Sequence, residues 1–298
     1  MKRRDFLARV AAAAPVMTAL TARAKAQSGV SAAKLARISI MTYNYRSSLK
    51  LPSQPSSPDR TIAVLDIPQM FADTWGLHNI EFQHAHFEST ETSYLTELRA
   101  RIAKAGSRMT QINVEFGEMT VSAANPVLRD QAIDLTVRWV DRAAVLNCPR
   151  VMINQGRPFS PANIAAATAA LRRIADYAKT KDVKISVETR TPPQGENAGS
   201  RTGTMEWELV KQLVEGSGAY SNVDIGNLMA TDQAALHTAI KGLFPSSSGN
   251  MHIKISPAWD LATAIRFTNN DLGYKGLYSI EVDPPLIRGV FDTILASI

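Results

Sequence analysis

Four residues in the second half of the sequence carry side chains that can bind a metal ion or move a proton. Glu188 ends the run VKISVE, Asp224 lies in SNVDIGN, His252 in NMHIKIS and Glu281 in YSIEVD. Each lies within or just after a short apolar run of the kind that forms a buried strand. A lone buried carboxylate is more often a paired structural charge than a ligand. Four ionisable groups on successive runs indicate a shared partner.

That partner is predicted to be a cation. Three carboxylates that converge would repel one another unless a positive charge lay among them. Three oxygen ligands and one nitrogen suit a single divalent ion, for which we favour Mn²⁺, with Co²⁺, Mg²⁺ and Zn²⁺ as alternatives. The only cysteine, Cys148, is remote in the sequence from the four residues, which argues against a structural zinc site. We therefore predict one metal site formed by Glu188, Asp224, His252 and Glu281.

Eight β-like runs alternate with segments of helical spacing. The runs are ARISIMTY, HNIEFQ, TQINVEF, RVMINQ, VKISVE, SNVDIG, NMHIKI and LYSIEV. Apolar residues recur at helical spacing in 133–144 and 164–178, and further helices are expected at 64–74, 90–106, 204–216, 231–242, 258–269 and 286–297. This order predicts a single α/β domain over residues 37–298, a (β/α)8 TIM barrel with its site at the carboxyl ends of the strands. A doubly wound nucleotide-binding sheet would need an early glycine-rich loop, which the sequence lacks.

From RISIMTYN to its end, the chain resembles the sugar phosphate isomerase/epimerase group of the xylose isomerase-like TIM-barrel superfamily. That group has Glu, Asp, His and Glu on strands five to eight, and together they hold one metal ion. HNIEFQ is similar to its G-x-x-x-V-E pattern, and DLGYKGLYSIEV to its G-Y-x-G-x-x-S-I-E ending. The resemblance implies a metal-dependent isomerase or epimerase acting on a small carbohydrate.

The same resemblance implies a mechanism. The substrate carbonyl and a neighbouring hydroxyl would bind the metal, which would act as a Lewis acid and stabilise an enediolate. Glu188 and Glu281 would be the catalytic acid and base, one removing the proton and the other returning it. Lys254, two residues after His252, would steady an oxyanion or hydroxyl of the substrate, or would simply be a lysine at a strand end with its charge in solvent.

Two positions depart from the pattern of the group. Many members have D-x-x-H on strand six, where this chain has Asn227, and many have His or Asn two residues after the first Glu, where it has Arg190. Both residues are substrate-binding candidates. The departures leave open a metal-dependent lyase or dehydratase acting on a keto-sugar, or a barrel that binds a sugar without turning it over.

Five further residues are candidates for substrate contact. His84 and His86 share one face if their strand continues, and otherwise they are loop residues. Glu115 and Asn154 lie at the ends of the third and fourth runs, and Trp259 is placed to stack on a sugar ring. Capping, loop and packing roles are the alternatives.

Residues 1–26 have the pattern of an export signal. A basic start, MKRRDFLARV, precedes the apolar run AAAAPVMTAL and a cleavage site of the A-x-A type, AKA at 24–26. RRDFL at 3–7 resembles the twin-arginine signal R-R-x-F-L, while an amphipathic helix is the alternative. We therefore expect export by the twin-arginine machinery, cleavage, and a periplasmic protein without stable membrane association. The oligomeric state is left open.

The net charge of +6 belongs largely to that segment. It contains six basic residues and one acidic residue, and the remaining 272 residues contain 27 basic and 26 acidic ones. A nearly neutral chain offers no electrostatic basis for binding nucleic acid. The multi-zinc endonucleases of the same fold also need more histidines than the five present. We expect a small-molecule carbohydrate as the partner, and no nucleic acid.

Overall fold

The computed structural model describes residues 30–156, 159–189 and 206–298. Residues 36–298 belong to one unit, in which eight parallel strands pair in chain order and β1 closes the ring by pairing with β8. The described part of the other unit, residues 30–35, contains the short helix α2 (Ala32–Leu35). The predicted (β/α)8 TIM barrel is confirmed.

Each predicted strand is present, with ends shifted by a few residues. Residue pairs such as Asn154 with Glu188, and Asp224 with His252, lie side by side on neighbouring strands, so the carboxyl ends of β4 to β7 meet at one rim. The strands are β1 (Ile38–Met41), β2 (Asn79–Gln83), β3 (Arg108–Asn113), β4 (Arg150–Asn154), β5 (Lys184–Glu188), β6 (Tyr220–Asp224), β7 (Ser247–Ile253) and β8 (Leu277–Ile280).

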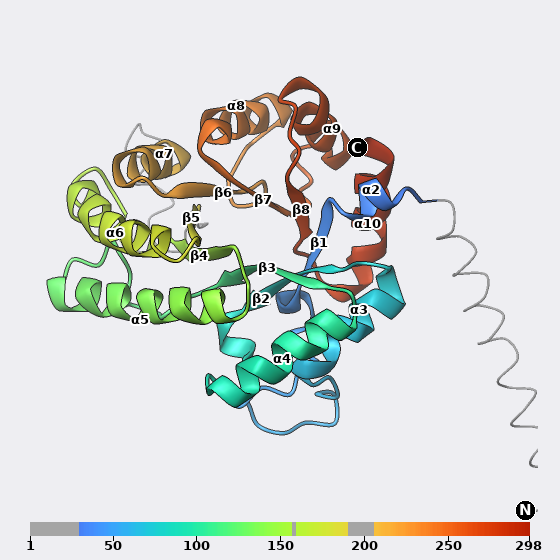
Figure 1. The fold of residues 1–298 in the computed structure, drawn as a ribbon. Helices are drawn as coiled ribbons and strands as arrows, with labels where there is room; N and C mark the ends of the chain where they lie inside the picture. The colour runs from blue at the N-terminus through green and yellow to red at the C-terminus, as the bar shows by residue number, and fades with distance from the viewer. Residues whose placement is uncertain (1–29, 157–158, 190–205) are drawn as a thin grey trace, which may run out of the picture. The chain divides into compact units, whose positions relative to one another are not determined.

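A helix follows each strand and lies outside the ring of strands (Figure 1). The predicted helix at 258–269 is the least regular, because its α-helical part ends at Arg266 and a π-helical turn, Phe267–Asp271, follows. No described helix is long and apolar enough to cross a membrane. The helices are α3 (Ile67–Trp75), α4 (Thr92–Lys104), α5 (Pro126–Val145), α6 (Ile164–Lys179), α7 (Glu206–Ser217), α8 (Gln233–Leu243), α9 (Leu261–Arg266) and α10 (Ile287–Ser297).

Side chains at the helix starts explain where several helices begin. The side chain of Asn125 accepts a hydrogen bond from the backbone N–H of Val127, and Pro126 occupies the first turn of α5. Asp232 and Asp260 cap α8 and α9 in the same way. These caps satisfy N–H groups that have no partner within the helix.

The two faces of the strands differ in chemistry. On β5, Ile185 and Val187 are buried on the face opposite to that of Ser186 and Glu188, since successive side chains of a strand alternate. Glu188 meets His252 of β7, so its face points into the barrel. The apolar core therefore lies between strands and helices, while the barrel interior receives polar side chains.

Candidate metal centre

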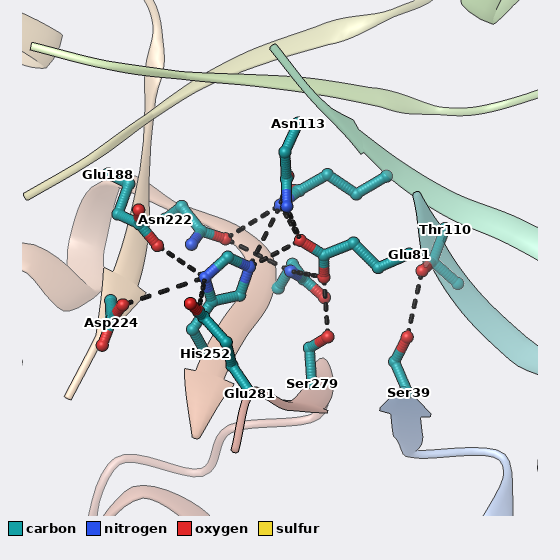
Figure 2. A network of polar contacts seen from close by, with 12 residues as sticks. Ser39, Glu81, Thr110, Asn113, Glu188, Asn222, Asp224, His252, Ser279 and Glu281 are labelled. Carbon is teal, nitrogen blue, oxygen red and sulfur yellow. Dashed lines mark hydrogen bonds and ion pairs between the residues drawn. The ribbon is translucent and has the colours of Figure 1, made fainter. Parts of the chain in front are cut away.

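The four predicted ligands converge at the carboxyl ends of β5 to β8. One ligand atom from each of Glu188, Asp224, His252 and Glu281 lies within 4.8 Å of the others. Nδ1 of His252 lies 2.5 Å from Oε1 of Glu188, 3.0 Å from Oε2 of Glu281 and 3.9 Å from Oδ2 of Asp224 (Figure 2). The alternation of β-strand side chains and the parallel pairing together bring these groups to one point.

The donor set and its burial fit a divalent cation. Asp224 and His252 are fully buried, and Glu188 is 7% exposed. Oε2 of Glu281 is buried and lies 3.0 Å from Nδ1 of His252, but it accepts no hydrogen bond, so a cation within the cluster would compensate its charge. Three carboxylates with one imidazole are ligands suited to Mn²⁺, Mg²⁺ or a related ion. These residues can therefore hold a metal ion.

The backbone and one lysine fix the orientation of Asp224. Its Oδ1 accepts hydrogen bonds from the backbone N–H groups of Gly226, at 2.9 Å, and Asn227, at 3.1 Å. Its Oδ2 lies 2.5 Å from Nζ of Lys254, which also lies 3.2 Å from Oε1 of Glu281. Burial opposes the charge of Lys254, but the nearby carboxylates outweigh it and raise the pKa. The lysine is a permanent cation at the edge of the cluster.

A fourth carboxylate, Glu81 of β2, lies on the other side of the His252 ring (Figure 2). It is fully buried, and its Oε1 lies 2.6 Å from Nε2 of His252. Burial alone would raise the pKa of Glu81, but His252 and hydrogen bonds from Ser279 and Asn113 lower it to about 2. Burial would likewise lower the pKa of His252, while Glu81 and Glu188 raise it well above its usual value. Sequence reasoning did not single out Glu81, although a charge in the middle of HNIEFQ was the available signal.

A cavity of about 250 Å³ opens onto the cluster and includes Glu188, His252 and Glu281 in its lining. Four of the predicted substrate-binding residues, Glu115, Asn154, Asn227 and Lys254, also line it. Sequence reasoning missed six others: Met41, Tyr43, Gln83, Asn113, Val114 and Met152. Met41, Gln83 and Asn113 are the last residues of β1, β2 and β3, so their position at strand ends was the signal.

Two histidines expected at the cavity are absent from its lining. The strand does not continue as the i, i+2 pattern required, because β2 ends at Gln83 and His84–His86 form a 3₁₀ turn. His84 packs edge-on against Trp139, and Nδ1 of His86 bonds the hydroxyl of Thr42 at 2.8 Å. Gln83 reaches the cavity in their place.

One other candidate also stands apart from the described site. Trp259 is 8% exposed and is not among the residues that line the cavity, so it offers no face for a sugar ring there. Arg190 lies outside the described residues.

Comparison with known proteins agrees with this architecture. The model of the xylose isomerase-like TIM barrel family matches residues 71–285, and no curated protein matches the chain by sequence. A D-psicose 3-epimerase from Clostridium cellulolyticum H10, solved with D-tagatose, is 13% identical with a TM-score of 0.65, over 88% of this chain and 96% of the epimerase.

Two more solved structures share the fold. The 3-keto-D-glucoside 4-epimerase of E. coli is 12% identical with a TM-score of 0.64, over 88% of this chain and 99% of that one. A xylose isomerase-like TIM barrel protein from Mycobacterium smegmatis, in complex with magnesium, is 14% identical with a TM-score of 0.62, over 90% of this chain and 98% of that one. Identities this low establish the fold alone. Because the family model spans most of the barrel, the chain belongs to the xylose isomerase-like TIM barrel family.

Proposed function

We propose that this protein is a metal-dependent isomerase or epimerase that acts on a free or oxidised sugar by proton abstraction next to a carbonyl. One observation carries the proposal. Glu188 ends β5 and Glu281 directly follows β8; with Asp224 and His252 they form a cluster suited to a divalent ion, and both glutamates line the cavity. Two carboxylates beside a Lewis acid are the groups that such a reaction requires.

In this mechanism, Glu188, Asp224, His252 and Glu281 would hold the metal ion, which would supply Lewis acidity and so acidify the proton beside the substrate carbonyl. One of the two glutamates removes that proton and the other returns it. Lys254 remains protonated and stabilises negative charge on a substrate oxygen. The buried surroundings of the cluster strengthen both effects, since water screens charges less there.

The cavity supports a single sugar unit as the substrate. At about 250 Å³ it is smaller than the pockets of roughly 300–1,000 Å³ that hold drug-sized ligands. Four amide side chains, those of Gln83, Asn113, Asn154 and Asn227, offer donors and acceptors for hydroxyl groups. Three carboxylates in the lining, Glu115, Glu188 and Glu281, disfavour an additional phosphate.

Hydrogen exchange tests the reaction. The metal-loaded protein is incubated in heavy water with a panel of ketoses and keto-sugars, and deuterium at carbon is followed by mass spectrometry and NMR. We expect exchange with epimeric or isomeric product in the wild type, and none in Glu188→Gln. Release of water or a cleaved fragment would instead indicate a lyase. Tight sugar binding without exchange would indicate a binding protein and contradict the proposal.

The metal requirement has its own test. Elemental analysis of the wild type should find about one divalent ion per chain, and the double variant Glu188→Gln, Asp224→Asn should hold none. Asparagine retains an oxygen for the N–H groups of Gly226 and Asn227, so the local fold is preserved. Equal metal content in the double variant would refute the site.

We also propose that residues 1–26 direct export through the twin-arginine machinery to the periplasm. The support is the RRDFL motif, the apolar run and the AKA site. Cell fractionation with mass spectrometry should find the mature protein in the periplasm, starting at Gln27. The variant Arg3→Lys, Arg4→Lys should accumulate as an uncleaved precursor in the cytoplasm, and unchanged export of that variant would overturn the proposal.

A further inference from the structure

The two ring nitrogens of His252 face two different carboxylates, one on each side of the ring. Nε2 lies 2.6 Å from Oε1 of Glu81, and Nδ1 lies 2.5 Å from Oε1 of Glu188 on the side of the metal ligands (Figure 2). We propose that Glu81 is a positioning residue of the metal centre, which holds Nε2 as an N–H donor and thereby presents the lone pair of Nδ1 to the cation. This inference rests on the proposed metal site.

The assignment of the nitrogens follows from what each partner can do. An ionised carboxylate only accepts hydrogen bonds, so Nε2 beside Glu81 must carry the hydrogen. Without a metal ion, Nδ1 beside Glu188 also carries a hydrogen, and a bound cation would displace that hydrogen. The ring is then neutral, with its N–H on Nε2 and its lone pair on Nδ1. A metal ion binds the lone pair, and a carboxylate on the other nitrogen is the arrangement that orients ligand histidines. Without Glu81, the ring could turn or exchange its hydrogen between the two nitrogens.

Glu81 is itself immobilised by donors from three other strands. Its Oε1 accepts from Nδ2 of Asn113 at 2.7 Å and Nε2 of Gln111 at 3.0 Å, both on β3. Its Oε2 accepts from Nδ2 of Asn250 on β7 at 3.0 Å and from the hydroxyl of Ser279 on β8 at 2.6 Å. Because all four of these donors lie on strands, the carboxylate of Glu81 is held in a fixed position before a cation binds.

The strands that carry the ligands also support Glu81. Two residues before each ligand, on the same face, stands a small polar residue: Ser186, Asn222, Asn250 and Ser279. Asn250 and Ser279 bond Glu81, and Oδ1 of Asn222 accepts from Nδ2 of Asn250 at 3.2 Å. Barrel interiors are ordinarily filled by bulky branched side chains, and replacing a buried charge by such residues is often stabilising. A polar layer centred on a buried carboxylate is therefore better explained by the metal centre than by stability.

A pair of variants separates positioning from general damage to the barrel. Glu81→Gln keeps the shape but removes the charge and offers only one acceptor oxygen. Ser39→Ala is the matched control, because Ser39 is also fully buried in the barrel but bonds Thr110 and the carbonyl of Asn79. By calorimetric titration with Mn²⁺, we expect Glu81→Gln to bind about 10- to 100-fold more weakly than the wild type. Ser39→Ala should bind as the wild type does.

A second measurement needs no variant. In the Zn²⁺-loaded wild type with ¹⁵N-labelled histidine, long-range proton–nitrogen correlations should show the proton of His252 on Nε2 and the metal on Nδ1. The opposite assignment, or wild-type affinity for Mn²⁺ in Glu81→Gln, would overturn the inference while leaving the proposed function standing. A wild type that binds no divalent ion would overturn both.

Discussion

The ammonium nitrogen of Lys254 lies 2.5 Å from Oδ2 of Asp224 and 3.2 Å from Oε1 of Glu281. Two of the four candidate metal ligands are therefore already paired with a cation that belongs to the protein. The lysine side chain is 24% exposed, and its pKa is raised by the same carboxylates, so it stays charged at neutral pH. It offsets the negative charge of the cluster and also repels any further cation.

Lys254→Met should separate these two effects. Without the ammonium group, we expect the affinity for Mn²⁺ to rise by about tenfold or more, because like charges a few ångströms apart repel by about 4 kcal/mol or less at a protein surface. We expect turnover to fall by about 100-fold, since the substrate oxyanion loses its counter-charge. Calorimetry and steady-state kinetics measure the two quantities. Lys241→Met, at an exposed position of α8, is the control, and weaker metal binding in Lys254→Met would contradict the expectation.

Gln83 and His86 should respond differently to substitution. Gln83→Leu removes an amide from the cavity, and we expect a several-fold rise in KM for the sugar, as for the loss of one neutral hydrogen bond. His86→Leu breaks the buried bond to Thr42, and we expect a lower melting temperature with KM unchanged. The reverse pattern would show that His86 contacts the substrate.

Cys148 should be inert in the folded protein. It is 2% exposed, and burial raises its pKa to about 12, so almost no thiolate forms at pH 8. We expect no reaction with a thiol reagent in buffer and one reactive thiol per chain in urea, both followed by absorbance. Rapid labelling without denaturant would rule out the buried position.

Glu81 should make stability depend on pH. Its pKa is about 2 in the folded protein against a usual value of 4.5, so its contribution is complete above about pH 4.5 and is lost as the pH falls towards 2. The shift corresponds to about 3 kcal/mol. In urea unfolding with chelator present, the difference in unfolding free energy between wild type and Glu81→Gln should shrink by about that amount between pH 5 and pH 2. A difference independent of pH would show that Glu81 is not ionised in the fold.

The four-ligand cluster could be predicted because each member ends an apolar run on its own strand, and consecutive parallel strands share a rim. Glu81 could not be placed in the same way. Its donors come from β3, β7 and β8, as many as 198 positions away, and no local pattern connects them. The recurring Ser or Asn two residues before each ligand was visible in the sequence, but its meaning depends on knowing which faces point inward.

The position at which a strand ends was the other feature that could not be predicted from the sequence. The spacing of His84 and His86 has a meaning only if β2 continues, and the chain instead turns after Gln83. Apolar alternation located β2 but carried no information on where it stops. Boundaries of that kind are decided by contacts such as the bond from Thr42 to His86, which join residues 44 positions apart.

The polar interior also constrains how the chain folds. Glu81 enters the barrel with β2, among the first strands, but three of its five partners, Asn250, His252 and Ser279, arrive with β7 and β8. A fragment that stops after β4 would have to bury a carboxylate with only Asn113 and Gln111 to solvate it, or leave the barrel open to water. We therefore expect the two halves of this barrel to fold together, because closure of the ring is the step that completes the hydrogen bonds of Glu81.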